Sequence, residues 1–512
     1  MRGGIGRRRS VDTDVIVIGS GAGGSVAALE LATAGRQVTV LEEGPRIGTP
    51  AIAKASPAEN MRTLYRNGGL VPILGAPAIA YGEGRVVGGT TVVNGGLLWD
   101  PPPALLARWA AVSGIDGYRA ADLAPHLRTV AGRLGAAFQQ HGGPDANRDS
   151  RLLALGAERL GWDWQHSRRV APGCLHRNRC TTGCPSGAKQ SMAVSYLPRA
   201  EALGAHISPD TRVLRLLHDG RTVCGALAVG PDGRPVAYRA RSVFLAAGPL
   251  GTPVLLQRSG IQQRRAGREL ALHVNLRTVA RFRERVAATD GTLFTAQLKE
   301  FGDRGILVMP SNVSRGALAA ALAGRDPAEV NRHLDDFDRL GVYTTQVRLL
   351  GTAAVRALPG GGMLLRHGMT GADHSALVDA FRIGSRLLLA AGADQLTPPV
   401  SSAEPLQTMS DVEEFCRRVR PADWELVSVH GMASARMGQP ERGGVCDERG
   451  RPFGFEGLHV CDASVLPGVT GISPQGTIMA FAHEILCRYL ADQESGRAPA
   501  AARPRRTEVA RT

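Results

Sequence analysis

The chain has 512 residues, of which 61 are Lys or Arg and 46 are Asp or Glu, so its formal net charge is +15. Hydrophobic residues make up 43% of the chain and charged residues 21%, a globular composition that excludes a wholly disordered protein. The length predicts two or three domains. Most of the positive charge lies in residues 1–10, 258–285 and 497–512, and only 4% of the residues are aromatic. We therefore expect no nucleic-acid partner, because such a partner needs a basic stripe interleaved with aromatic side chains.

The cysteines and the apolar runs of the sequence predict where in the cell the protein is located. Five of the eight cysteines are scattered singly: Cys224, Cys416, Cys446, Cys461 and Cys487. Isolated thiols of this kind are typical of a reducing cytoplasm. No apolar run approaches the ~20 residues that span a bilayer. The sequence predicts a cytoplasmic protein without a membrane span, and disordered basic tails at residues 1–10 and 493–512.

The first predicted elements in the chain form a βαβ unit with a nucleotide-binding site. Residues 14–18 read DVIVI and predict a buried strand, residues 25–34 a helix and residues 37–41 a second strand. The turn GSGAGG between strand and helix suits a pyrophosphate at the helix N-terminus, with Gly24 allowing the helix to pack closely on the strand. Glu42 follows the second strand and is placed to bind ribose hydroxyls. The predicted cofactor contacts here are Gly19, Ser20, Gly21, Ala22, Gly24 and Glu42.

Three further blocks carry a resemblance to a known family. Residues 84–95 read GRVVGGTTVVNG, residues 246–261 contain AAGPLGTP and SGI, and residues 457–482 read GLHVCDASVLPGVTGISPQGTIMAFA. Together with the first unit, and in this order, they resemble the glucose–methanol–choline (GMC) oxidoreductases.

The resemblance implies an α/β protein with two domains. A Rossmann-like FAD-binding domain would be assembled from residues 11–100, 200–262 and 435–492. A substrate-binding cap domain with an antiparallel sheet would comprise residues 101–199 and 263–434.

The resemblance also implies further FAD contacts: Gly89, Asn94, Gly95, Val213, Ala247, Asp462, Ala463, Pro474, Gln475 and Thr477. Some members of the family bind the flavin covalently through a His before the motif Asn. Here that position is Val93, which has no nucleophile. Non-covalent FAD is therefore expected.

The implied reaction is oxidation of an alcohol to an aldehyde or ketone. It needs a base for the hydroxyl proton and a hydride acceptor, which is the flavin N5 atom. The segment HGMASARMG, residues 430–438, resembles the family's H-x-x-G-T-x-R-M-G, so His430 is the predicted base. Ser473 stands where the family places a second His or Asn. Either Ser473, Gln475 or a cap-domain residue is expected to hold the substrate oxygen, and the alternative for Ser473 is that it only shapes the loop.

A cysteine cluster leaves three interpretations open. Cys174, Cys180 and Cys184 are spaced C-x5-C-x3-C-P. The segment is interpreted as a structural loop without metal, as in a Cys-rich GMC subgroup. An iron–sulfur cluster, as in certain bacterial GMC dehydrogenases, and a zinc site completed by His176 are the alternatives.

No motif names the substrate. The chain resembles small actinobacterial members that oxidise primary alcohols on sugars, including the 6′-hydroxyl of aminoglycoside precursors such as paromamine in secondary metabolism. Simple sugars, glycosides, sterols and aliphatic alcohols stay open, as does the electron acceptor, oxygen or another. The rival within the fold is a flavin-containing lyase without net redox chemistry. Gln346 and Arg348 alternate with apolar residues, so they face either the substrate pocket or solvent.

Overall fold

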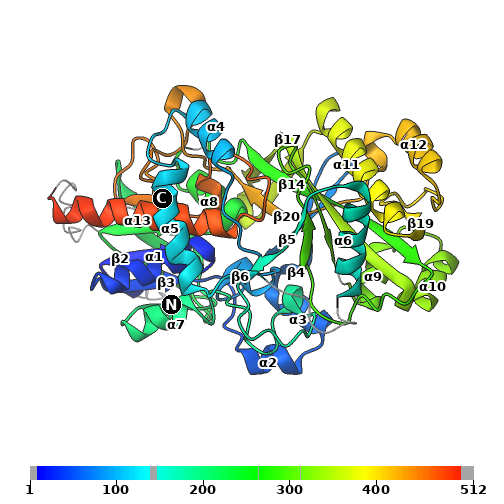
Figure 1. The fold of residues 1–512 in the computed structure, drawn as a ribbon. Coiled ribbons are helices and arrows are strands. Elements are labelled where there is room, and N and C mark those ends of the chain that lie inside the picture. Colours follow the sequence, from blue (N-terminus) through cyan, green and yellow to red (C-terminus); the bar gives the residue numbers. More distant parts are fainter. Residues whose placement is uncertain (1–8, 139–146, 263, 312, 497–512) are drawn as a thin grey trace, which may run out of the picture.

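A five-stranded, wholly parallel sheet forms the centre of one half of the molecule (Figure 1). The computed structural model describes residues 9–138, 147–262, 264–311 and 313–496. The strands of this sheet lie in the order β21 (Leu458–Val460), β13 (Ser242–Leu245), β2 (Val15–Ile18), β3 (Val38–Leu41) and β9 (His206–Ser208). The central strands are short, rich in β-branched residues and buried, as expected for strands covered by helices on both faces. The first βαβ unit and the strands that precede or begin the blocks at residues 246–261 and 457–482 therefore meet in one sheet.

Helices surround this parallel sheet. They are α1 (Ala22–Thr33), α4 (Pro103–Ser113), α5 (Ala120–Arg133), α7 (Tyr196–Ala202), α8 (Gly248–Arg258) and α13 (Gln475–Glu494). Helix α1 packs between α7 and α13, and α5 packs on α13. A small sheet of β1 (Arg9–Asp12), β12 (Pro235–Arg239), β11 (Thr222–Val229) and β10 (Arg212–Asp219) adjoins them.

A ten-stranded, mainly antiparallel sheet forms the other half (Figure 1). Its main path is β4 (Tyr65–Ile73), β5 (Ile79–Gly84), β20 (Leu426–Met432), β14 (Leu270–Phe282), β17 (Leu340–Ala357), β16 (Ile306–Pro310), β15 (Ala296–Leu298) and β7 (Trp164–His166). In addition, β18 (Met363–His367) pairs with β17, and β19 (Ala393–Thr397) pairs with β14. The predicted α/β fold with an antiparallel cap sheet is confirmed.

Two long helices cover the large sheet. Helix α11 (Gly371–Ala390) begins at a capping box formed by Thr370 and Asp373, and it packs on β17 and on α6 (Arg148–Leu160). Its apolar stripe is buried with the sheet's inner face in one core. The remaining helices are α2 (Thr49–Lys54), α3 (Pro57–Leu64), α9 (Arg315–Ala321), α10 (Pro327–Asp335) and α12 (Met409–Arg418), and β6 (Ala137–Phe138) pairs with β8 (Arg168–Arg169).

The structure departs from the predicted domain segments in two places. Strands β4 and β5 lie within residues 11–100, yet they belong to the ten-stranded sheet, where β5 pairs in parallel with β20. Helices α4 and α5 lie within residues 101–199, and α7 begins there, yet their apolar side chains, including Trp109 and Tyr196, are buried in the core around the parallel sheet. Amphipathic helices and edge strands pack on whichever apolar face is open beside them, and their sequence does not specify which one.

Both predicted tails include residues that belong to regular secondary structure. Arg9 and Ser10 pair with β12 as part of β1, and Gln493 and Glu494 belong to α13. The other residues of the two tail predictions lie outside the described residues, except for Ser495 and Gly496.

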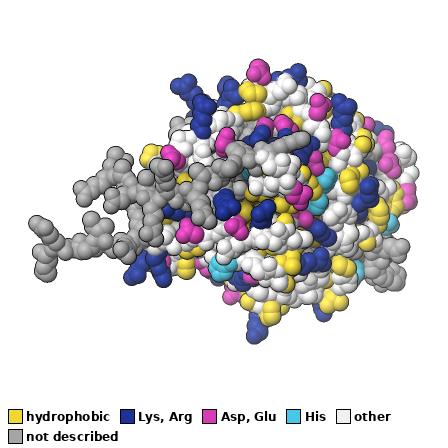
Figure 2. Space-filling view, turned by 90° about the vertical axis from the view of Figure 1, so that its left-hand side faces the viewer, with side chains coloured by type: hydrophobic (Ala, Val, Ile, Leu, Met, Phe, Trp, Pro, Cys, Tyr) yellow, Lys and Arg dark blue, Asp and Glu magenta, His cyan; other side chains and the backbone are white. Residues whose placement is uncertain are grey.

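Two arginines of the basic segment at residues 258–285 pair with acids from elsewhere in the fold. Arg281 contacts Asp394 at 3.0 Å and Asp336 at 3.9 Å. Arg285 lies 3.5 Å from Asp338. Figure 2 shows Arg and acidic side chains interspersed over the face that it presents. Within the described residues, no helix is both long and apolar enough to cross a membrane.

Candidate active site

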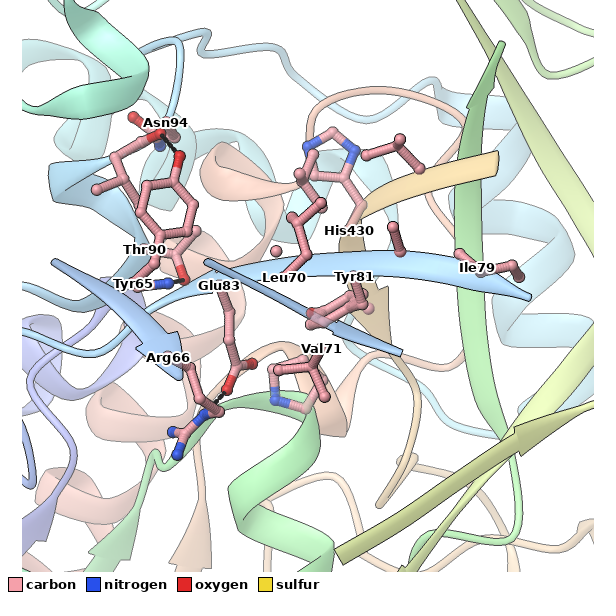
Figure 3. Close-up of a pocket in the computed structure, with 18 of the residues that line it drawn as sticks. Tyr65, Arg66, Leu70, Val71, Ile79, Tyr81, Glu83, Thr90, Asn94 and His430 are labelled. Carbon is pink, nitrogen blue, oxygen red and sulfur yellow. Dashed lines mark hydrogen bonds and ion pairs between the residues drawn. The ribbon is translucent and has the colours of Figure 1, made fainter. Parts of the chain in front are cut away.

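A cavity of about 1460 Å³ lies where the two halves meet. The turn after β2, the loop around Asn94, strands β5, β14 and β20 and the start of α13 all contribute to its lining (Figure 3). Single ligand pockets commonly hold about 300–1,000 Å³. The cavity therefore has room for a large cofactor and a second molecule.

The glycine turn at one end of the cavity forms an open cradle. Gly19 has φ +95°, and a Cβ there would lie 2.2 Å from the carbonyl oxygen of Ala246. A Cβ on Gly24 would lie 2.0 Å from the carbonyl oxygen of Gly19, so Gly24 serves the close packing of α1 and does not line the cavity. By contrast, a Cβ added to Gly21 would have no other atom within 4 Å. The N-terminus of α1, which has no side-chain cap, thus faces free space suited to a pyrophosphate.

Glu42 is held at the end of β3 by the same turn. Its Oε2 accepts hydrogen bonds from the backbone N–H and the hydroxyl of Ser20, at 3.0 and 2.6 Å. Its Oε1 accepts from the N–H of Gly44 at 2.8 Å. Burial raises the pKa of Glu42, and the hydrogen bonds from Ser20 and Gly44 oppose this shift. Glu42 lines the cavity, and its Oε1, which accepts from Gly44 alone, retains a lone pair for a ribose hydroxyl.

Asp462 fixes the opposite wall. Its Oδ2 accepts from the N–H of Gly248 at 2.7 Å and from the hydroxyl of Thr252 at 2.6 Å. Its Oδ1 accepts from the N–H of Ser464 at 2.8 Å. Burial is the main cause of its raised pKa. Because these contacts join α8 to the loop after β21, they fix the second and third family blocks relative to each other.

Asn94 and Gln475 join the remaining cofactor segments. Asn94 Nδ2 donates to Gln475 Oε1 at 2.6 Å, which connects the loop of residues 84–95 to the first residue of α13. Asn94 Oδ1 accepts from the N–H of Gly96 at 3.0 Å. The Gln475 amide is therefore occupied by Asn94, which favours cofactor positioning over direct catalysis.

Lys189 supports this loop from behind. Its Nζ is buried and donates to the carbonyl oxygens of Val92, Asn94 and Cys180 at 2.7–2.8 Å. Burial lowers the pKa of Lys189 to about 8. Sequence reasoning did not assign it a role, although it is one of only three lysines in the chain.

The donor set fits FAD. The cavity joins a phosphate cradle at α1, a carboxylate at ribose distance along the same βαβ unit, and Val213 on β10 beside them. Thr477 does not line the cavity, but its hydroxyl is buried without a partner among the described residues. Val93 offers no nucleophile on the cavity wall, in line with non-covalent binding.

His430 enters the same cavity from β20, directly opposite His273 on β14. Figure 3 shows its ring across the cavity from Asn94 and Thr90, with the Arg66–Glu83 ion pair on the side of β4 and β5. Loss of hydration inside the cavity lowers the pKa of His430 to about 4. The ring is therefore neutral at neutral pH, as a base must be.

A hydrogen-bond chain fixes the tautomer of His430. The N–H of Gly471 donates to His273 Nε2 at 2.9 Å. Burial, followed by the proximity of His430 and Arg348, lowers the pKa of His273 well below its ordinary value, so this ring is neutral and carries its hydrogen on Nδ1. That hydrogen points at His430 Nδ1, 3.1 Å away. His430 therefore accepts at Nδ1 and carries its own hydrogen on Nε2. Nothing in the sequence pattern singled out His273.

The other predicted residues are also brought together. Ser473 lines the cavity and is 9% exposed. Gln346 lines the cavity, whereas Arg348 does not. The cavity wall also includes these predicted cofactor residues: Gly19, Ser20, Gly21, Ala22, Glu42, Gly89, Asn94, Gly95, Val213, Ala247, Asp462, Ala463, Pro474 and Gln475.

The three clustered cysteines do not converge on a metal. Cys180 accepts from Arg169 Nη2 at 3.2 Å, and Cys184 accepts from the N–H of Lys189 at 3.5 Å. Among the described residues, neither these cysteines nor His176 belong to a group of three ligand atoms near one another. The segment is a loop whose contacts support Lys189 and Arg169.

Comparisons with known proteins identify the family of the chain. Models of the GMC oxidoreductase family match residues 61–275 and 363–482, and a model of an FAD binding domain matches residues 14–58. An uncharacterised GMC-type oxidoreductase of Mycobacterium tuberculosis is 35% identical over 92% of this chain and 74% of its own length. Another, from Sinorhizobium fredii, is 33% identical over 98% of this chain and 100% of its own length.

More distant relatives have named activities. The long-chain-alcohol oxidase FAO3 of Arabidopsis thaliana is 25% identical over 95% of this chain and 69% of its own length. The crystal structure of pyridoxine 4-oxidase from Mesorbium loti shares the fold, with a TM-score of 0.73 and 18% identity over 94% of this chain and 99% of that chain. By its family models, its full-length relatives and the cradle at α1, the chain belongs to the GMC oxidoreductase family and is an FAD-dependent alcohol oxidoreductase.

Proposed function

We propose that the chain oxidises the hydroxyl group of a small-molecule alcohol to an aldehyde or ketone, with His430 as the residue that handles the hydroxyl proton. The observation that carries this is the position of a neutral His430 in the same cavity as the α1 cradle and the Asn94–Gln475 pair. FAD, when bound, supplies the hydride acceptor at N5.

The two tautomers of His430 have different roles, because one orients the alcohol and the other removes its proton. With the hydrogen on Nε2, His430 donates to the substrate oxygen and orients it. Removal of the hydroxyl proton by Nε2 needs the opposite tautomer, in which His430 carries hydrogen on Nδ1 and His273 carries it on Nε2. Both rings stay neutral in this exchange, but the Gly471 N–H then loses its acceptor, 2.9 Å away. His273 is accordingly a positioning residue that sets which tautomer faces the substrate.

Ser473 is proposed as a second contact for the substrate oxygen. It lies on the cavity wall immediately before Pro474, and no competing partner for its hydroxyl is present among the described residues. Replacement of Ser473 by Ala is expected to raise KM; unchanged turnover and unchanged KM would remove Ser473 from the mechanism. Gln475 is proposed to act through Asn94, because its amide oxygen already accepts from that side chain.

The lining of the cavity favours a neutral substrate with an apolar body. Beyond His430, the wall on the large-sheet side contains these apolar residues: Val279, Met309, Val313, Ala317, Leu322 and Val342. Arg277 also lines it and makes no hydrogen bond or ion pair with a described residue. Of the acids on this side, Glu83 is paired with Arg66 and Asp423 with Arg420 at 2.8 Å, whereas Glu425 has no ion pair with a described residue.

These charges bear on the candidate substrates. A cationic aminoglycoside hydroxyl, and with it a role in secondary metabolism, is the less favoured proposal, since the guanidinium of Arg277 repels a substrate ammonium group. A long-chain or otherwise apolar alcohol is favoured, in line with the long-chain-alcohol oxidases among the relatives. Molecular oxygen is the proposed acceptor, because the named relatives are oxidases. A cytoplasmic location is proposed from the cysteines, all eight of which are free thiols.

Anaerobic mixing of the FAD-loaded protein with alcohols tests the proposal. The panel contains a long-chain primary alcohol, a neutral sugar and an aminoglycoside, and the readout is loss of the flavin's visible absorption. We expect the long-chain alcohol to bleach the flavin and oxygen to restore its absorption. Product formation without bleaching would establish the flavin-containing lyase instead. Bleaching by the aminoglycoside alone would overturn the substrate class and leave the oxidoreductase proposal standing.

A further inference from the structure

A second cluster of metal-binding side chains lies away from the flavin cavity. His126 extends from α5, and His483 and Cys487 extend from α13, where their spacing of four residues puts them on one helix face. None of the three lines the cavity. It is the one group of three or more potential ligands that comes together among the described residues.

The ligand atoms converge on one point. His126 Nδ1 lies 2.7 Å from His483 Nδ1, and Cys487 Sγ lies 3.5 Å from His483 Nδ1. All three atoms lie within 4.8 Å of one another. Tetrahedral zinc with Zn–N of 2.0–2.1 Å and Zn–S of about 2.3 Å puts sulfur and nitrogen about 3.5 Å apart and the two nitrogens about 3.3 Å apart. The Cys487–His483 pair already has this spacing, and the two rings need to separate by roughly 0.6 Å.

Carboxylates orient both rings from outside. Glu484 Oε2 lies 2.8 Å from His126 Nε2, and Glu30 Oε1 lies 3.5 Å from His483 Nε2. A carboxylate accepts and does not donate, so each ring holds a hydrogen on Nε2 and turns the lone pair of Nδ1 inward. A carboxylate on the outer nitrogen is the usual partner of a metal-bound histidine. At 2.7 Å the two Nδ1 atoms share one hydrogen when no metal is bound, and a metal ion between them would displace it.

The surrounding charges are balanced. Glu484 Oε1 lies 2.6 Å from Arg488 Nε, and Glu30 is paired with Arg133. The inner atoms are two imidazole nitrogens and one sulfur, a set that suits zinc and not the oxygen-seeking cations calcium and magnesium. Because Cys487 is exposed, a water molecule has access to the fourth position.

We propose that His126 Nδ1, His483 Nδ1 and Cys487 Sγ bind one Zn²⁺ ion, with water as the fourth ligand. As zinc binds, the thiol of Cys487 and the hydrogen shared by the two rings both leave as protons to solvent, and no oxidation or reduction takes place. The ion would join α5 to α13, the helix whose first residue, Gln475, binds Asn94 in the flavin cavity. Its role is structural, at a distance from the reacting atoms.

Metal analysis of the FAD-loaded protein tests the site. After exposure to excess zinc and removal of unbound ions, about one equivalent of zinc per chain is expected. Cobalt(II) in place of zinc should give the visible bands of a tetrahedral cobalt–thiolate site, at longer wavelengths than the flavin absorbs. Cys487→Ser and His126→Ala should lose the metal and these bands. Cys224→Ser, which changes a half-buried thiol on β11, is the matched control and should keep both.

A second variant addresses the outer carboxylate. Glu484→Gln is expected to weaken zinc affinity about 10- to 100-fold without removing a ligand. Flavin content and circular dichroism establish that each variant is folded. Wild-type protein that is folded and binds less than about a tenth of an equivalent, or Cys487→Ser binding as much as the wild type, would overturn the proposal and leave a proton between the two rings.

Discussion

The Nδ1 atoms of His273 and His430 lie 3.1 Å apart across two antiparallel neighbouring strands. His273 is wholly buried and accepts from the Gly471 N–H, so its hydrogen is directed at His430. The loop that carries Gly471 also carries Ser473 and leads into α13. The protonation pattern of the candidate base is thereby connected to the loop beside the flavin.

His430→Ala is expected to slow flavin reduction by the alcohol 10²- to 10⁴-fold, the usual contribution of a general base. FAD content should stay unchanged, because the residues of the α1 cradle and Asp462 are intact. Stopped-flow measurement of anaerobic bleaching checks this. His206→Ala, on an exposed end of β9, is the control and should behave as the wild type. A loss of less than about threefold in His430→Ala would exclude it as the base.

His273→Ala is expected to raise KM about fivefold with little change in kcat, since it removes the hydrogen bond, worth about 1 kcal/mol, that holds His430 in the tautomer donating to the substrate oxygen. His273→Asn, whose amide can both donate and accept, should reverse part of this rise. Nitrogen-15 chemical shifts give a direct readout. They should show hydrogen on Nε2 of His430 in the wild type and a mixture of tautomers in His273→Ala. The same tautomer in both proteins would mean that His273 does not set it.

The pH profile of flavin reduction should report the lowered pKa of His430. A protonated imidazole cannot accept the hydroxyl proton, and with a pKa of about 4 the ring stays neutral well below its ordinary value of 6.5. The rate at saturating alcohol is therefore expected to be constant from about pH 7 down to about pH 5 and to fall below about pH 4. A fall centred near pH 6.5 would show that the ring is hydrated in the working enzyme.

Lys189 should make the stability of the protein sensitive to alkaline pH. Burial lowers the pKa of Lys189 from its ordinary value of 10.5 to about 8, so the folded protein binds this proton less tightly than the unfolded chain does. The free energy of unfolding is therefore expected to rise between about pH 8 and about pH 10, as Lys189 loses its proton in the fold. Thermal unfolding of the FAD-loaded protein over this range measures the change.

Lys189→Met removes three hydrogen bonds that support the loop around Asn94, so it should release FAD and show no such rise in stability with pH. Lys299→Met, which changes a lysine over the ring of Trp99 outside the cavity, is the matched control. FAD retention by Lys189→Met equal to that of the wild type would contradict the role given to Lys189.

Gly23→Ala should disrupt the junction of α1 with the third family block. A Cβ on Gly23 would lie 1.8 Å from the carbonyl oxygen of Cys461, next to Asp462. Backbone must shift, and overpacking of this kind costs about 1–3 kcal/mol. Loss of FAD and a lower Tm are expected. Gly132→Ala on α5, where a Cβ meets nothing within 4 Å, should leave FAD binding unchanged and stabilise the protein by up to about 1 kcal/mol. Equal Tm values for the two variants would contradict this packing.

By itself, the sequence determined the parts of this protein that depend on local pattern. The βαβ unit with its glycines, the FAD cradle and the family follow from short contiguous blocks, because a strand, a tight turn and a helix N-terminus are specified by neighbouring residues. The HGMASARMG segment likewise pointed to His430.

Only the tertiary structure decided which distant segments meet. Strands β4 and β5 pair within the large sheet, and helices α4, α5 and α7 pack in the other half. The sequence of an apolar face does not specify which other face it packs against. His273 met His430 through the register of β14 with β20, and Lys189 reached the loop around Asn94 only because both are buried together. His126 came to His483 and Cys487 by the packing of α5 on α13. Contacts between residues hundreds of positions apart depend on long-range packing, and no spacing rule in the sequence encodes it.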